Sequence, residues 1–142
     1  MAEVIEEGTT ERRGDARLRH FLLRLPRPVE RVWAAVATPQ GLREWLTAVD
    51  LEPRLGGAVA LRLPEGTAPG RVTAWDVERV AEYTVEGRGR VRFHLEPAPP
   101  GGTTVRFTYE SQPTESGREP DWRGRFEQLA RVLGGESPAS GA

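Results

Sequence analysis

The sequence contains no cysteine, no lysine and no asparagine, and only two histidines occur in its 142 residues. Without cysteine there is no disulfide framework, no thiolate metal site and no cysteine nucleophile, and a reducing cytoplasm fits this composition. The two histidines, His20 and His94, have no carboxylate cluster nearby, and alternation points both outward, so we expect no metal site. No Ser/His/Asp arrangement, phosphate-binding loop or dinucleotide fingerprint is present, and we assign no catalytic or cofactor-binding residue.

Long apolar runs and charge of a single sign are also missing. Twenty basic residues balance 21 acidic ones to a formal charge of -1, and no basic run occurs, which argues against nucleic acid as a partner. No segment approaches the roughly 20 apolar residues of a membrane helix, and residues 1–15 are acidic where a secretory signal would be basic and then apolar. We therefore expect a soluble, cytoplasmic protein with no membrane partner.

Two short helices are predicted early in the chain. Pro28 suits the first position of a helix because its φ is fixed and it has no N–H to lose. Pro39 ends that helix, and Thr38 before it is a good N-cap for a second one. Apolar residues recur at helical spacing in both segments, so we expect Trp33 and Trp45 to be more than half buried in one corner of the core.

Six strand candidates with an apolar period of two follow the helices. The clearest runs from Arg90 to Glu96, where Val91, Phe93 and Leu95 alternate with charged or polar residues. The connections between the six strands carry glycine or proline and are too short for a crossover. The pattern therefore predicts an antiparallel meander.

A strand over Ala16 to Leu25 precedes the helices, and a final helix over Pro120 to Leu133 should lie across the sheet. The predicted fold class is α+β, in the order strand, two short helices, six strands and a C-terminal helix around which the antiparallel sheet wraps. Residues 16–135 form the predicted domain. Residues 1–15 and 136–142 have little to bury and are predicted to be flexible tails.

This order of elements resembles the helix-grip fold of the START-like superfamily, also called SRPBCC. The segment from Arg27 to Ala35, followed by Thr38-Pro39, is similar to the opening of bacterial homologues of the activator of heat-shock-protein ATPase. Two later motifs occur in the same order as in that family, namely Gly56-Gly57 and the run from Gly102 to Val105. The resemblance covers Ala16 to Leu133. It implies a cavity between a curved sheet and a long helix, which takes apolar or amphipathic small molecules.

Large aromatic side chains gather on the inferred inner faces of the strands and on the final helix. Such rings either pack solidly or line a void, and two are tyrosines, whose buried hydroxyls need a partner that a ligand can supply. Together with the resemblance, they predict a ligand cavity bounded by six residues: Tyr83, Phe93, Phe107, Tyr109, Trp122 and Phe126.

Other polar side chains are interpreted as surface. Glu82 would serve as a proton-transfer partner of Tyr83 only if it were buried, and alternation places it on the opposite face of its strand. The arginines on outward faces are interpreted as a solvated sheet surface rather than an anion site: Arg62, Arg90, Arg92 and Arg106.

Three functions remain open. The first is the binding of a small hydrophobic or amphipathic molecule between the sheet and the C-terminal helix, without catalysis, cofactor or metal. The second is a polyketide cyclase or aromatase activity in the same cavity, which needs buried ionisable groups. The third is a protein-interaction module, co-chaperone-like or homodimeric, which an exposed apolar patch would favour. The identity of the ligand does not follow from the sequence.

Overall fold

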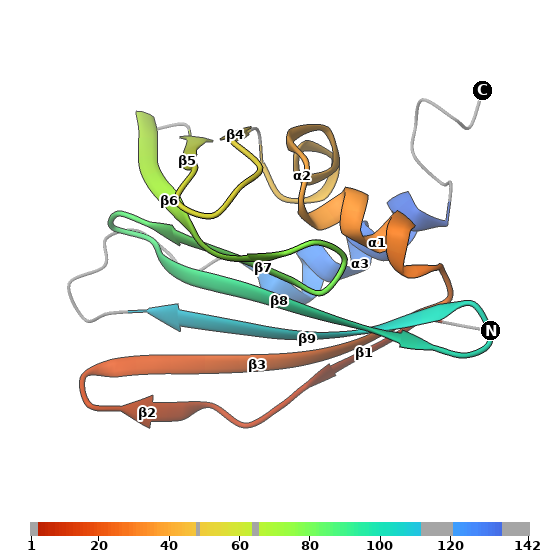
Figure 1. Cartoon of the computed structure of the whole chain (residues 1–142). Helices are drawn as coiled ribbons and strands as arrows, with labels where there is room; N and C mark the ends of the chain where they lie inside the picture. The colour runs from red at the N-terminus through yellow and green to blue at the C-terminus, as the bar shows by residue number, and fades with distance from the viewer. Residues whose placement is uncertain (1–2, 48, 64–65, 112–120, 135–142) are drawn as a thin grey trace.

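The computed structural model describes residues 3–47, 49–63, 66–111 and 121–134. In this part of the chain nine strands form one antiparallel sheet, and three helices lie over one of its faces (Figure 1). The fold is therefore α+β, with the C-terminal helix held against the sheet as the helix-grip prediction requires. None of the described helices is long and apolar enough to cross a membrane.

The helices begin where the sequence signals place them, within one or two residues. Their bounds are α1 Val29–Val36, α2 Pro39–Trp45 and α3 Trp122–Leu133. Pro28 is the N-cap of α1, one position before its predicted place, while Thr38 caps α2 by accepting a hydrogen bond from Gly41 N at 3.0 Å. Asp121 caps α3, and the predicted start at Pro120 lies outside the described residues.

The strands follow the predicted meander, with the first long strand paired to the last. β3 and β9 run side by side with Phe21 opposite Phe107, and the sheet order is β1-β3-β9-β8-β7-β6-β5-β4, with β2 also paired to β3. The bounds are β1 Val4–Glu7, β2 Glu11–Arg13, β3 Ala16–Leu25, β4 Val49–Leu51, β5 Ala58–Leu63, β6 Gly66–Asp76, β7 Val80–Val85, β8 Gly89–Ala98 and β9 Gly102–Ser111.

The N-terminal segment forms strands, which corrects the expectation of a flexible tail over residues 1–15. Both β1 and β2 pair with β3. Ile5 lies opposite Leu23 and packs against the core, while Glu6 forms an ion pair with Arg24. The segment is polar, but β3 presents a strand edge to it, and one inward apolar side chain fixes which face turns to the core. The predicted C-terminal tail, 136–142, lies outside the described residues.

The core fills the space between the sheet and the helices. Trp45 is 2% exposed, and its Nε1 donates a hydrogen bond to Ala35 O at 2.8 Å. Trp33 is partly buried and packs edge-on against Trp75 of β6, with ring centroids 5.0 Å apart. Both tryptophans of the helix pair are therefore more than half buried, as predicted.

The opposite face of the sheet carries ion pairs between neighbouring strands. Arg106 pairs with Glu96 at 3.0 Å, which confirms that this arginine belongs to a polar surface. Glu82 points to this face as alternation predicts, but the expectation that it is exposed is wrong, because only 8% of the residue is accessible. Arg92 and Thr73 cover its carboxylate, and Thr73 Oγ1 donates to Glu82 Oε1 at 2.7 Å.

Candidate ligand-binding site

The six predicted cavity residues lie together between the sheet and α3. The strands β7, β8 and β9 contribute four of them from their inner faces, and α3 contributes the other two from the stripe that faces the sheet. None is more than 6% exposed. We call this group the ring cluster: Tyr83, Phe93, Phe107, Tyr109, Trp122 and Phe126.

The ring cluster is closely packed. Phe107 is at its centre, with ring centroids 4.7 Å from Trp122, 4.9 Å from Phe126 and 5.2 Å from Phe93. Tyr109 lies 5.3 Å from Trp122 on the far side. These separations are typical of aromatic pairs in direct contact. In this state the rings contact one another, so a ligand that enters the cluster has to separate α3 from the strands.

Two further aromatic residues, missed in the sequence analysis, complete the cluster. Phe21 of β3 lies 5.2 Å from Phe126, and Trp45 of α2 lies 5.9 Å from Phe126 and 6.0 Å from Phe93. Phe21 and Leu23 are two positions apart in β3 and share a face, so the sequence did contain a signal for Phe21. For Trp45 only burial was predictable, because the sequence does not say which strand α2 packs against.

The hydroxyl groups of the cluster have protein partners. Tyr83 Oη donates to Val36 O of α1 at 2.7 Å, and Tyr109 Oη donates to Arg88 O at 2.9 Å. Burial raises the pKa of Tyr83 above its ordinary value, so the phenol stays protonated at neutral pH. Tyr83 thus ties β7 to α1, and Tyr109 ties β9 to the turn before β8.

The indole nitrogen of Trp122 differs from these groups. Trp122 is 3% exposed, yet its buried Nε1 has no hydrogen-bond partner among the described residues. By contrast, Nε1 of the equally buried Trp45 donates to a backbone carbonyl. Buried polar groups are nearly always paired, so an unpaired indole N–H inside an aromatic cluster is an exception that needs a physical reason.

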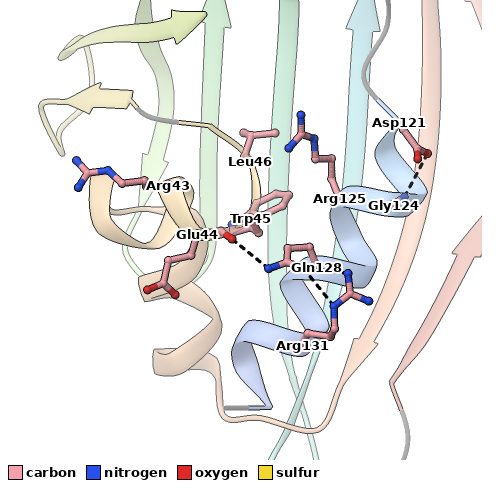
Figure 2. A pocket seen from close by; sticks show the side chains of 9 residues that line it. All are labelled: Arg43, Glu44, Trp45, Leu46, Asp121, Gly124, Arg125, Gln128 and Arg131. Atoms are coloured by element: carbon pink, nitrogen blue, oxygen red, sulfur yellow. Dashed lines mark hydrogen bonds between the residues drawn. The ribbon is translucent and has the colours of Figure 1, made fainter. Parts of the chain in front are cut away.

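A groove of about 520 Å³ separates α2 from α3 (Figure 2). Gln128 reaches across it from α3, and its Nε2 donates to Glu44 O at 3.5 Å. Figure 2 shows Arg125 extending from α3 toward Leu46, while Arg43 points away from α3. The groove is lined by Arg43, Glu44, Trp45, Leu46, Asp121, Gly124, Arg125, Gln128 and Arg131.

Two arginines of the groove, Arg43 and Arg125, have no side-chain hydrogen bond or ion pair with another described residue, and Arg125 is the one that extends from α3 toward Leu46. Arg131 donates to Gln128 Oε1 at 2.9 Å, but the side chain of Arg125 makes no hydrogen bond or ion pair with any other described residue. The sequence analysis did not identify the groove. Exposed arginines at helical positions look the same in a sequence whether they face a groove or open solvent.

Gly124 faces this groove, but the space left by its missing side chain is occupied. Its N–H donates to Asp121 Oδ1 at 3.2 Å, and a Cβ added at Gly124 would lie 2.5 Å from Asp121 Oδ2. The glycine therefore makes room for the carboxylate that caps α3.

Trp45 joins the groove to the ring cluster. Trp45 is one of the residues that line the groove, and its ring contacts Phe93 and Phe126 of the cluster. The end of α2 thus places one aromatic side chain at the boundary between a polar opening and the apolar interior.

The histidines lie away from this site, on the outer face of the sheet. His20 Nδ1 is 3.2 Å from Thr108 Oγ1, and His94 Nδ1 is 3.6 Å from Glu96 Oε1. In the described part of the chain no three histidine, aspartate or glutamate side chains gather as metal ligands would.

Several solved structures share this architecture. A conserved protein of unknown function from Enterococcus faecalis superposes with a TM-score of 0.77 at 16% identity, over 88% of this chain and 75% of that one. CalU16 from Micromonospora echinospora superposes with a TM-score of 0.71 at 21% identity, over 98% of this chain and 88% of that one. The Aha1 dimer from Colwellia psychrerythraea superposes with a TM-score of 0.63 at 20% identity, over 82% of this chain and 95% of that one. At these identities the likeness establishes the fold.

The chain is a helix-grip protein of the SRPBCC superfamily, as its order of elements predicted. Residues 23–139 match the family described as polyketide cyclase / dehydrase and lipid transport, and the chain belongs to that family. No curated protein sequence matches it. The family and the fold together support a scaffold built to hold a ligand between sheet and helix.

Proposed function

We propose that the protein binds a small apolar or amphipathic molecule between the sheet and α3, and that the molecule enters through the groove between α2 and α3. The observation that carries the proposal is the position of Trp45, which lines the groove and contacts Phe93 and Phe126 of the ring cluster. A ligand in the groove would therefore touch the apolar interior at one ring and would leave a polar end among the groove side chains.

The size of the groove supports this proposal. Sites for small molecules have volumes of about 300 to 1,000 Å³. The groove has about 520 Å³, and the unpaired Arg125 lies at its edge. Entry of the apolar part would exchange ring contacts within the cluster for ring contacts with the ligand, so little apolar surface would be exposed.

The experiment is a titration of the native protein with a fluorescent fatty-acid analogue and with anilinonaphthalene sulfonate, together with thermal unfolding at excess probe. A ligand that binds only the folded state raises Tm; at 100 times Kd the stabilisation is about 2.7 kcal/mol. Trp122→Ala should change the uptake, because it removes one wall of the cluster. Absence of both uptake and thermal shift over a broad set of apolar probes contradicts the proposal.

A control separates the proposed site from exposed apolar residues. Leu55 is 64% exposed in the loop between β4 and β5 and does not line the groove. Leu55→Ala should leave probe uptake unchanged if the probe binds between sheet and α3. Loss of uptake in Leu55→Ala with retention in Trp122→Ala would place binding on the surface instead.

A cyclase activity in the same space is the second candidate, because the description of the family includes polyketide cyclases. The two titratable groups of the ring cluster are tyrosines, and each already donates its hydroxyl to a backbone carbonyl. The cluster can therefore orient a flexible chain, but it offers no free acid or base for proton transfer. Binding is the function that this geometry supports better.

A further inference from the structure

We propose that the ligand carries a neutral hydrogen-bond acceptor, a carbonyl or ether oxygen, which accepts the indole N–H of Trp122. This inference rests on the proposed binding function and adds the chemical class of the ligand. It is carried by the unpaired Nε1 of Trp122, a donor that is buried between α3 and β9.

The surroundings of this donor select a neutral acceptor. Trp122 contacts Phe107, Tyr109 and Phe126, so its surroundings are aromatic rings. Moving an ionised carboxylate among rings costs far more than moving a neutral carbonyl, because the charge loses its hydration and finds no counter-ion there. A single oxygen on an otherwise apolar molecule matches a single donor in an apolar wall.

The buried, unpaired N–H of Trp122 also supplies a driving force for binding a ligand oxygen. An unpaired buried donor retains its desolvation penalty, and a ligand oxygen that accepts its hydrogen bond removes that penalty. A hydrocarbon of the same shape makes the same apolar contacts but leaves the N–H unpaired. The protein should therefore discriminate between two molecules that differ only in that oxygen.

The competing arrangement is an N–H directed at the face of a neighbouring ring. Phe107 and Tyr109 lie 4.7 and 5.3 Å from Trp122 between ring centroids, and N–H to ring contacts are weakly favourable. In that case the donor needs no ligand oxygen, and the two molecules should bind equally.

The test compares 2-acetylnaphthalene with 2-isopropenylnaphthalene, in which a CH₂ group replaces the carbonyl oxygen. The wild-type protein should bind the ketone about five- to tenfold more tightly than the hydrocarbon. Trp122→Phe keeps an aromatic ring and removes the N–H, so it should abolish this ratio. Trp75→Phe is the control, because Trp75 packs on Trp33 outside the ring cluster, and it should keep the ratio.

A second measurement does not depend on the stability of the variant. In wild-type protein labelled with ¹⁵N, the indole N–H resonance of Trp122 should move downfield with the ketone and should not do so with the hydrocarbon. Equal affinities together with an unmoved resonance overturn the inference and leave the binding function standing. Failure of both molecules to bind overturns the binding function, and the inference falls with it.

Discussion

Arg27 closes the carboxyl end of the helix that forms one wall of the proposed site. Its Nε donates to Leu133 O, the carbonyl of the last residue of α3, at 2.7 Å, across 106 positions of sequence. Arg31 Nη2 lies 3.5 Å from the same oxygen. The last carbonyls of a helix lack intrahelical partners and carry partial negative charge, so a cation there both donates and complements the dipole. The loop before α1 thereby holds α3 against the sheet.

Removal of this contact should destabilise the protein. Arg27→Ala is expected to lower the free energy of unfolding by about 1 to 3 kcal/mol, because it removes a charged donor from a partly buried carbonyl. Arg24→Ala is the control, since Arg24 forms only an exposed ion pair with Glu6, and it should cost less than about 1 kcal/mol. Urea unfolding measures both changes, and equal losses would contradict a role for Arg27 at the end of α3.

Gly124 and Asp121 should show coupled effects on stability. In most helices Gly→Ala stabilises by about 1 kcal/mol. Here the added Cβ would lie 2.5 Å from Asp121 Oδ2, so Gly124→Ala should displace the cap and gain nothing. Asp121→Ala alone should cost about 0.5 to 2 kcal/mol, and in that background Gly124→Ala should recover about 1 kcal/mol. A double-mutant cycle by urea unfolding measures this coupling, and additive effects would contradict it.

Tyr83 should make stability fall at alkaline pH. Its pKa is raised in the folded state by burial, whereas the unfolded chain has the ordinary value of about 10. Above that pH the unfolded chain loses the tyrosine proton while the folded protein keeps it. The contribution of Tyr83 to the free energy of unfolding is therefore fully present below a pH of about 10. Above that pH it is lost at up to about 1.4 kcal/mol per pH unit. Unfolding measured from pH 8 to 11 should show a steeper decline for wild type than for Tyr83→Phe. Parallel curves would contradict the assignment.

Arg125 should favour ligands with an anionic end at the groove. A fatty-acid analogue with a free carboxylate should bind Arg125→Gln about two- to fivefold more weakly than wild type, and the effect should shrink at high salt because the site is exposed. The methyl ester of the same analogue should bind both proteins equally. Arg43→Gln is the matched control, because Arg43 points away from α3 (Figure 2). An equal loss in both variants would indicate a general charge effect.

The sequence predicted the fold through signals that are local. Pro39 and Thr38 determine where α2 starts, and the alternation around Phe93 determines the inner face of β8. The pairing of β1 could not be predicted in this way, because it depends on an edge of β3 that exists only after β3 and β9 have paired. Of the two apolar residues of β1, Val4 and Ile5, only Ile5 packs against the core, and two adjacent apolar residues before a polar segment carry no strand signal.

The sequence predicted which faces carry the residues of the ring cluster, but not the contacts between elements that shape the candidate site. Period-two alternation places Phe93 and Phe107 on inner faces, but the contact of Trp45 with the cluster depends on how α2 packs against β8. Glu82 shows the same limit. Alternation along β7 predicts that Glu82 lies on the outer face of the sheet. Its burial results from Arg92 and Thr73 on the neighbouring strands, which cover its carboxylate.

The most direct test of the proposed site is the set of intermolecular nuclear Overhauser effects in a saturated complex with 2-acetylnaphthalene. A ligand held between the sheet and α3 should give effects to the ring protons of Trp45, Trp122 and Phe126, and none to the exposed methyl groups of Leu55 or Val77. Effects confined to Leu55 or Val77, or none at all at saturation, would contradict the account.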